Sequence, residues 1–112
     1  MSSGVGSQSA ISVQQLAEWR QAGTPHTVLD VREDDELLVC RIENSVHIAM
    51  ANIPARLADL PLDVPVVVLC HHGMRSMQVV KFLHAAGRLN AVNLTGGIDA
   101  WASDIDSDLR RY

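Results

Sequence analysis

Short runs of β-branched apolar residues alternate along this chain with segments of helical periodicity. The clearest run, Val64 to Leu69, contains four valines and precedes a helical pattern that reaches Ala86. Shorter runs at 27–31, 45–48 and 91–94 are predicted to be strands for the same reason. Strands that alternate with helices predict an α/β fold, with a mostly parallel central sheet of four to five strands and helices on both faces.

Capping residues and apolar spacing predict the helices between these strands. Ser12 with a Gln three residues later has the form of a capping box, and Gly23 is suited to end the helix that follows. Segment 33–39 is expected to form one or two helical turns, and 52–60 a further helix. In the predicted helix 75–86, one apolar face is formed by Val79, Val80, Leu83 and Ala86.

The length of 112 residues suits one domain with one hydrophobic core. Residues 1–10 are rich in Ser and Gly and lack the basic start and apolar block of a signal peptide, so they are predicted to be a flexible leader. The domain is expected to span 11–103, and the polar end, 104–112, is expected to be a loosely held tail. A compact monomer is the expected oligomeric state.

Composition argues against several classes of function. The net charge is −4 and no basic run occurs, so nucleic acid is not expected as a partner. No stretch approaches the roughly 18 apolar residues of a membrane span, so no membrane association is predicted. Two cysteines, Cys40 and Cys70, are too few for a disulfide scaffold. A reducing compartment fits this cysteine content, and the prediction is a cytoplasmic protein.

Cys70 lies directly after the predicted strand 64–69 and just before a helix. In parallel α/β sheets, ligands bind beyond the carboxyl ends of the strands, and Arg32 and Thr95 are expected near the same edge. Free N–H groups at a helix start, together with the positive end of the helix dipole, favour an anion. Such a setting lowers the pKa of a thiol, so Cys70 is predicted to be a reactive thiolate.

The loop around this cysteine resembles the active loop of the rhodanese sulfurtransferases. That family has Cys, two residues, Gly, one residue, Arg, and then Ser or Thr; here the matching residues are Cys70, His71, His72, Gly73, Met74, Arg75 and Ser76. The segment 29–32 is similar to the Leu-Asp-Val-Arg strand end of the family, and 93–101 to its closing Leu-x-Gly-Gly-Ile-x-Ala-Trp. One departure is segment 40–45, where Asn44 is expected to adopt the positive φ that a Gly would supply.

The resemblance implies a sulfurtransferase of the thiosulfate type that needs no cofactor, with Cys70 as its catalytic nucleophile. The thiolate would take the outer sulfur of a small-molecule donor such as thiosulfate as a persulfide and pass it to cyanide or a thiol. A protein is an alternative sulfur acceptor. The residues expected to bind substrate are His71, His72, Gly73, Met74, Arg75 and Ser76. Arg75 either binds an anionic donor or pins the loop to the scaffold, and the sequence leaves both roles open.

Other functions remain as alternatives. The chain could be a persulfide carrier or a binding module for a partner protein. Phosphatases and arsenate reductases of related fold place five residues between Cys and Arg, whereas four lie between Cys70 and Arg75, which disfavours them. Adjacent residues such as His71 and His72 rarely converge on one ion, so no metal site is predicted.

Three residues outside the loop are interpreted mainly as structural. Asp30 and Arg32 are expected to support the strand end through hydrogen bonds and an ion pair, with substrate binding as the alternative. Cys40 is expected to be packed in the protein interior, with a role as resolving thiol for Cys70 as the alternative.

Overall fold

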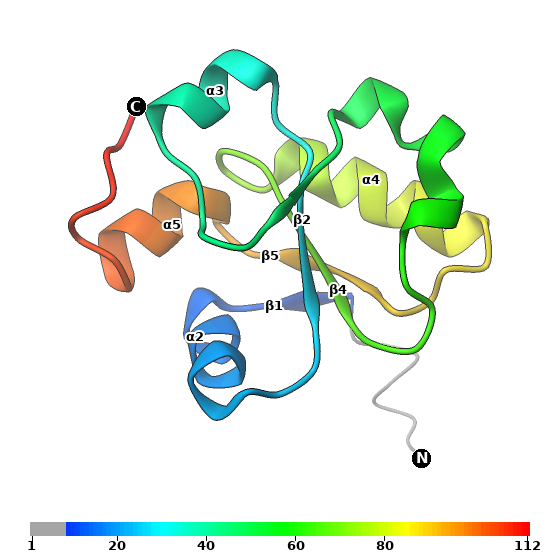
Figure 1. Cartoon of the computed structure of the whole chain (residues 1–112), viewed down its shortest axis with the longest axis horizontal. Helices are drawn as coiled ribbons and strands as arrows, with labels where there is room; N and C mark the ends of the chain where they lie inside the picture. Colours follow the sequence, from blue (N-terminus) through cyan, green and yellow to red (C-terminus); the bar gives the residue numbers. More distant parts are fainter. Residues whose placement is uncertain (1–8) are drawn as a thin grey trace.

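A five-stranded parallel sheet forms the centre of the molecule (Figure 1), with strand order β1-β5-β4-β2-β3. The structure is a computed structural model of the chain and describes residues 9–112. The strands are β1 (Ala10–Ile11), β2 (Thr27–Asp30), β3 (Val46–His47), β4 (Val66–Leu69) and β5 (Ala91–Leu94). The predicted α/β class and parallel sheet are therefore confirmed.

Helices connect the strands. They are α2 (Val13–Ala22), α3 (Asp34–Val39), α4 (Met74–Ala85), α5 (Gly97–Asp104) and the 3-10 helices η1 (Met50–Asn52) and η2 (Pro54–Asp59). As predicted, the Ser12 hydroxyl caps α2 by accepting a hydrogen bond from the Gln15 amide, and Gly23 ends this helix with a φ of 72°. Asn44 also has the expected positive φ, at 65°. None of the helices that the structure describes is long and apolar enough to cross a membrane.

Two details of the predicted helices are wrong. Segment 52–60 is not one helix, because Arg56 has φ −123° and ψ 22°, outside the helical region, and the backbone forms short 3-10 turns on either side of it. Ala86 does not belong to the apolar face of α4. The helix ends at Ala85, and Ala86 is an exposed C-cap residue.

Alternate side chains of β2, β4 and β5 enter two separate cores on the two faces of the sheet. Val67 and Leu69 of β4 pack on the side of α2 and α5, together with Ile98 and Trp101 of α5. The neighbouring residues of β4, Val66 and Val68, pack with Val79, Val80 and Leu83 of α4 on the other side. Because helices cover both faces (Figure 1), the strands have the continuous apolar character that is seen in the sequence.

The leader predicted over residues 1–10 is too long, because Ala10 already belongs to the first strand. Ala10 and Ile11 form β1, which pairs with Asn93 and Leu94 of β5, and the Asn93 amide donates a hydrogen bond to the Ser9 carbonyl. A two-residue strand has almost no sequence signature of its own, since its pairing depends on a partner more than eighty residues away. The rest of the predicted leader, residues 1–8, lies outside the described part of the chain.

The polar tail is also held more firmly than expected. It folds back from α5 so that the end of the chain lies beside α3 (Figure 1). Arg111 forms an ion pair with Asp99 at 3.0 Å, and the Tyr112 ring stacks on the His71 ring. The partners of both residues belong to distant segments, so the composition of the tail alone could not reveal these contacts.

A fully buried ion pair fixes the carboxyl end of β2. Arg32 Nη2 donates to Asp30 Oδ2 at 2.7 Å, and neither side chain is exposed to solvent. Arg32 also donates to the main-chain carbonyls of Glu36 and Cys40, which ties the segment through α3 to the strand. Burial lowers the pKa of Arg32, but its hydrogen bonds to Asp30 and Tyr112 raise it by more, so the guanidinium stays charged.

Removal of the Asp30 carboxylate should therefore destabilise the fold strongly. We expect Asp30→Ala to lower the free energy of unfolding by about 3–5 kcal/mol, because Arg32 is left as an unpaired buried charge. Asp59→Ala is the matched control, since it breaks an exposed pair with Arg56 and should cost less than about 1 kcal/mol. Urea unfolding of the two variants measures the difference, and equal losses would show that the buried pair does not stabilise β2.

Candidate active site

The residues from Cys70 to Gly73 connect the carboxyl end of β4, the central strand, to the start of α4. Gly73 is the N-cap of α4 and has a φ of 108°, a conformation that residues with a side chain rarely adopt. A Cβ at this position would also lie 3.4 Å from the Gly96 amide nitrogen. Glycine therefore allows the loop to turn tightly between the strand and the helix.

The sulfur of Cys70 receives hydrogen bonds from the first turn of α4. The Gly73 amide lies 3.1 Å and the Ser76 amide 3.3 Å from Sγ, and the Ser76 hydroxyl lies 3.4 Å from it. Amides at a helix start have no carbonyl partner within the helix, so they are free to stabilise an anion. Cys70 itself is only 1% exposed. The sulfur thus lies in a cup of main-chain donors.

Two opposing effects set the acidity of this thiol. Burial raises the pKa of Cys70, because a thiolate is less stable away from water. The contact with the Ser76 side chain and the hydrogen bonds from the amides of Ser76, Gly73 and Arg75 lower the pKa of Cys70, and together they outweigh the effect of burial. The pKa of Cys70 consequently lies below that of an ordinary cysteine, which favours a nucleophilic thiolate.

Asn93 of β5 completes the cup and was not among the residues predicted from the sequence. The Ser76 hydroxyl donates to Asn93 Oδ1, and Asn93 Nδ2 donates to the Gly73 carbonyl at 3.3 Å. Asn93 is 3% exposed in a strand whose other residues are apolar. A single amide in a buried strand needs hydrogen-bond partners, and this was the sequence signal that could have identified it.

The start of α5 holds the loop from its other side. The Ile98 amide donates to the Cys70 carbonyl at 2.9 Å, and the Asp99 amide donates to the His71 carbonyl at 3.0 Å. Gly97 lies so close that an added Cβ would come within 2.5 Å of both carbonyl oxygens. Gly97, the first residue of α5, therefore allows this helix to approach the backbone of the cysteine.

Arg75 makes a bidentate ion pair with Glu36 of α3. Its Nη1 and Nη2 lie 2.7 and 2.8 Å from the two carboxylate oxygens. The hydrogen bonds from Arg75 lower the pKa of Glu36 to about 2, although burial opposes them. In this structure Arg75 joins the loop to α3, and its predicted role in substrate binding stays a prediction. Glu36 was not predicted as a site residue, because its partner lies 39 positions away.

The remaining predicted loop residues lie at the rim. His71 is partly buried, and its pKa is lowered by burial and by the neighbouring charge of His72. His72 Nδ1 lies 3.8 Å from an Asp99 carboxylate oxygen. Met74 is 76% exposed. Gly73 and Ser76 thus contact the sulfur directly, while the other predicted residues surround the cup.

The residues interpreted as structural lie beside the cup and not within it. Asp30 and Arg32 bond to each other and to α3. Cys40 lies 3.9 Å from Arg32 Nη1 and packs in the core on the α2 and α5 side, whereas Cys70 belongs to the core on the α4 side. Both thiols are free. Their placement in different cores disfavours Cys40 as a resolving thiol.

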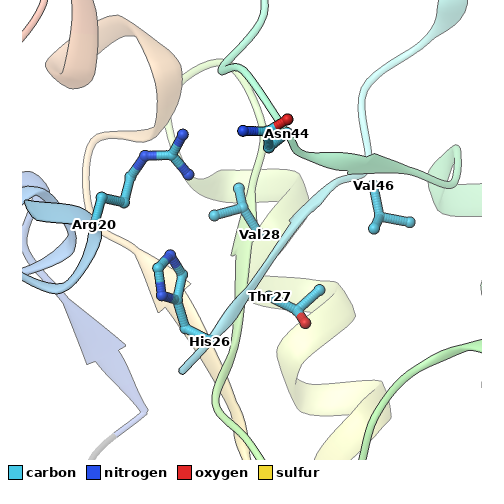
Figure 2. Close-up of a pocket in the computed structure, with 6 residues that line it drawn as sticks. All are labelled: Arg20, His26, Thr27, Val28, Asn44 and Val46. Carbon is cyan, nitrogen blue, oxygen red and sulfur yellow. The ribbon is translucent and has the colours of Figure 1, made fainter. Parts of the chain in front are cut away.

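A further cavity lies away from Cys70, at the amino ends of β2 and β3 (Figure 2). It has a volume of about 430 Å³ and is lined by Arg20, His26, Thr27, Val28, Asn44 and Val46. None of these residues was predicted as a site residue. Among residues 9–112, no three His, Cys, Asp or Glu side chains are grouped so that they could hold a metal ion.

Comparison with known proteins identifies the family of this chain. The family model of the rhodanese-like domain matches residues 12–104. The chain is similar to "Putative sulfurtransferase YtwF" of Bacillus subtilis (strain 168), with 39% identity over 94 residues that cover 84% of this chain and 90% of that protein. It is also similar to the crystal structure of a rhodanese-related protein from Thermoplasma volcanium, with 36% identity, a TM-score of 0.77, and coverage of 87% and 93% of the two chains.

Some relatives are much longer than this chain. Adenylyltransferase and sulfurtransferase MOCS3 of Mus musculus is 30% identical over 125 residues, and the match covers 91% of this chain but only 27% of that protein. The matched segment is therefore one part of a larger protein in that relative.

The contact between α5 and the loop leads to a stability prediction. Gly97→Ala should lower the free energy of unfolding by about 2–4 kcal/mol, because a positive φ and a clash with two carbonyls act together. Gly87→Ala is the control: its φ is also positive, at 87°, but its Cβ would meet open space, so the cost should be about 1–2 kcal/mol. Urea unfolding compares them, and a smaller loss for Gly97→Ala would contradict the close contact.

The acidity of Cys70 leads to a prediction about pH. In a Cys40→Ser background, the rate of alkylation by iodoacetamide should rise with pH and reach half of its maximum below about 8.5, the value for an ordinary cysteine. The midpoint is expected below the ordinary value because the pKa of Cys70 is lowered and the thiolate is the form that reacts. The same protein in concentrated urea is the control and should titrate near the ordinary value. A folded midpoint at or above the unfolded one would contradict the cup as a stabiliser of the thiolate.

Proposed function

Because the chain belongs to the rhodanese-like family and is a sulfurtransferase, we propose that it moves sulfane sulfur from thiosulfate, or a donor like it, to cyanide or a thiol through a persulfide on Cys70. The observation that carries this proposal is the pair of main-chain amides directed at Cys70 Sγ. They stabilise negative charge on sulfur without any rearrangement, and such fixed donors are effective in catalysis.

The first step of the proposed reaction loads the enzyme. The Cys70 thiolate attacks the outer sulfur of thiosulfate, a new S–S bond forms, and the old S–S bond breaks with its electron pair leaving on sulfite. The persulfide that results carries its charge one atom further out. The amides of Gly73 and Ser76 support the charge in the thiolate state, and the positive end of α4 supports it in both states.

The second step returns the enzyme to its starting state. A nucleophilic acceptor attacks the terminal sulfur, and the S–S bond breaks with its electrons returning to Cys70 as thiolate. The acceptor keeps the sulfur, as thiocyanate from cyanide or as a persulfide from a thiol. No cofactor is needed, because sulfur moves as an electrophilic atom between two nucleophiles.

The position of Arg75 supports sulfur transfer over phosphate or arsenate chemistry. The longer loop of phosphatases of related fold cradles a tetrahedral oxyanion, whereas here the guanidinium of Arg75 is paired with Glu36 in a bidentate ion pair. The four residues between Cys70 and Arg75 also give a shorter loop than those enzymes use. Both features favour a cup for one additional sulfur atom.

A second candidate differs only in the acceptor. The chain would then be a persulfide carrier that delivers sulfur to a partner protein. The similarity to a segment of MOCS3, whose name pairs adenylyltransferase with sulfurtransferase, favours it. A binding module without chemistry is disfavoured by the intact Cys70 and its donors. The two free thiols fit a reducing compartment, and we propose the cytoplasm.

The persulfide can be tested directly by mass spectrometry. After incubation with thiosulfate, the intact protein should gain the mass of one sulfur atom, located on the peptide that contains Cys70. Cys70→Ser should abolish both this gain and sulfur transfer to cyanide, while Cys40→Ser, the control for the second thiol, should keep both. Sulfur loading without turnover to cyanide would favour the carrier, and loading of the Cys70→Ser variant would exclude Cys70 as the nucleophile.

A further inference from the structure

The tail of the chain contacts the active-site loop although it lies outside the family domain. The domain match ends at residue 104, so 105–112 are additional to it. The Tyr112 ring nevertheless stacks on the ring of His71, the residue that follows Cys70, with centroids 3.9 Å apart and an angle of 6° between the planes. Stacked aromatic rings at this distance attract each other, so Tyr112 holds one rim residue in place.

The Tyr112 hydroxyl makes two further contacts. It accepts a hydrogen bond from Arg32 Nη1 at 3.0 Å and donates one to Glu36 Oε2 at 2.6 Å. Burial and the bond to Glu36 raise the pKa of Tyr112 to about 12, against the opposing effect of Arg32. The hydroxyl is therefore protonated at neutral pH and can donate to the carboxylate.

This contact completes the surroundings of the Glu36 carboxylate. Oε1 accepts from the Glu33 amide at 3.0 Å and from Arg75 Nη1, while Oε2 accepts from Arg75 Nη2 and from Tyr112. A carboxylate offers about four acceptor sites, and all four are used. The orientation of the Arg75 guanidinium is consequently fixed by the Glu36 carboxylate, which is itself fixed by Tyr112 of the tail.

The tail has its own anchor beside the loop. Arg111 Nε and Nη2 bond to the two carboxylate oxygens of Asp99 at 3.0 and 3.1 Å, and the Asp99 amide caps the His71 carbonyl. Leu109 packs against the core on the α5 side. These contacts keep Tyr112 over His71, so the tail forms a wall of the site.

Because Cys70 is buried, the tail affects which reagents can reach its sulfur. Its 1% exposure means that a reagent reaches the sulfur only when rim side chains move. Among the rim residues, Met74 is exposed, whereas His71 and Arg75 are held directly or indirectly by Tyr112. The main chain beneath them is fixed by hydrogen bonds to α5.

We propose that Tyr112 is a specificity-determining residue, which clamps His71 and, through Glu36, Arg75, so that small sulfur donors and acceptors reach Cys70 while bulky ones must displace the tail. This inference rests on the proposed function for its meaning in catalysis. The contact that it describes can nevertheless be tested on the thiol alone.

The test compares how fast Cys70 reacts with a small and a bulky thiol reagent. In the full chain with Cys40→Ser, the rates with iodoacetamide and with a polyethylene-glycol maleimide are measured near neutral pH, and their ratio is taken for each variant. Tyr112→Leu removes the ring and the hydroxyl and should raise the bulky-to-small ratio roughly tenfold. Tyr112→Phe keeps the stacked ring and should raise it only about threefold.

Arg110→Ala is the matched control in the same tail. Arg110 is exposed and makes no side-chain hydrogen bond or ion pair with residues 9–112. The bulky-to-small rate ratio of Arg110→Ala should therefore equal that of the parent protein. A ratio for Tyr112→Leu within about twofold of the parent would overturn the proposal, since stacking of this kind contributes more than that. If Tyr112→Leu unfolds, as urea titration would show, an unchanged ratio for Tyr112→Phe overturns it instead.

The outcome separates this inference from the proposed function. If the parent protein takes no sulfur from thiosulfate, the proposed function fails, and the reagent ratio still decides the role of Tyr112. If sulfur loads but the ratio is unchanged, the proposed function stands and the clamp is rejected.

Discussion

Two main-chain amides, those of Gly73 and Ser76, point at the sulfur of Cys70 from 3.1 and 3.3 Å. Much of the surrounding structure maintains this arrangement. Asn93 holds the Gly73 carbonyl, and the first amides of α5 hold the carbonyls of Cys70 and His71. The loop is thereby bonded on both sides by main-chain or amide groups, which do not change charge near neutral pH. A thiolate in this cup is stabilised by geometry that exists before any substrate binds.

Charged residues near the cup are mostly paired with one another. Arg32 pairs with Asp30 inside the protein, Arg75 pairs with Glu36, and the Tyr112 hydroxyl connects Arg32 to Glu36. This pairing leaves little free positive charge beside the sulfur. The thiolate therefore depends on amide dipoles and the start of α4 for its stability, in agreement with the amide and hydroxyl contacts that lower the pKa of Cys70. The arginines contribute by fixing α3 and the tail against the loop.

Features that depend on neighbouring residues could be predicted from the sequence. The valine run that forms β4, the Ser12 cap, the positive φ of Asn44 and the cysteine between strand and helix are all local in this sense. Features that depend on distant partners could not. β1 forms because Ile11 pairs with Leu94 of β5. Glu36 belongs to the site because it forms an ion pair with Arg75. The tail lies beside the loop because the Tyr112 ring stacks on His71. The helix predicted over 52–60 was wrong for a different reason, because a helical sequence pattern does not reveal that Arg56 has a non-helical φ.

Burial and reactivity make opposite demands on Cys70, and the structure meets them with different groups. A sulfur that is 1% exposed is protected from other thiols, but a persulfide needs space for one more atom. The main chain cannot supply that space, because the amides of Ile98 and Asp99 and the side chain of Asn93 fix it. The space must come from rim side chains, of which Met74 is exposed and is not held by the tail, whereas His71 moves only with Tyr112. A rigid base with a movable rim lets the same sulfur stay protected at rest and accept an atom during turnover.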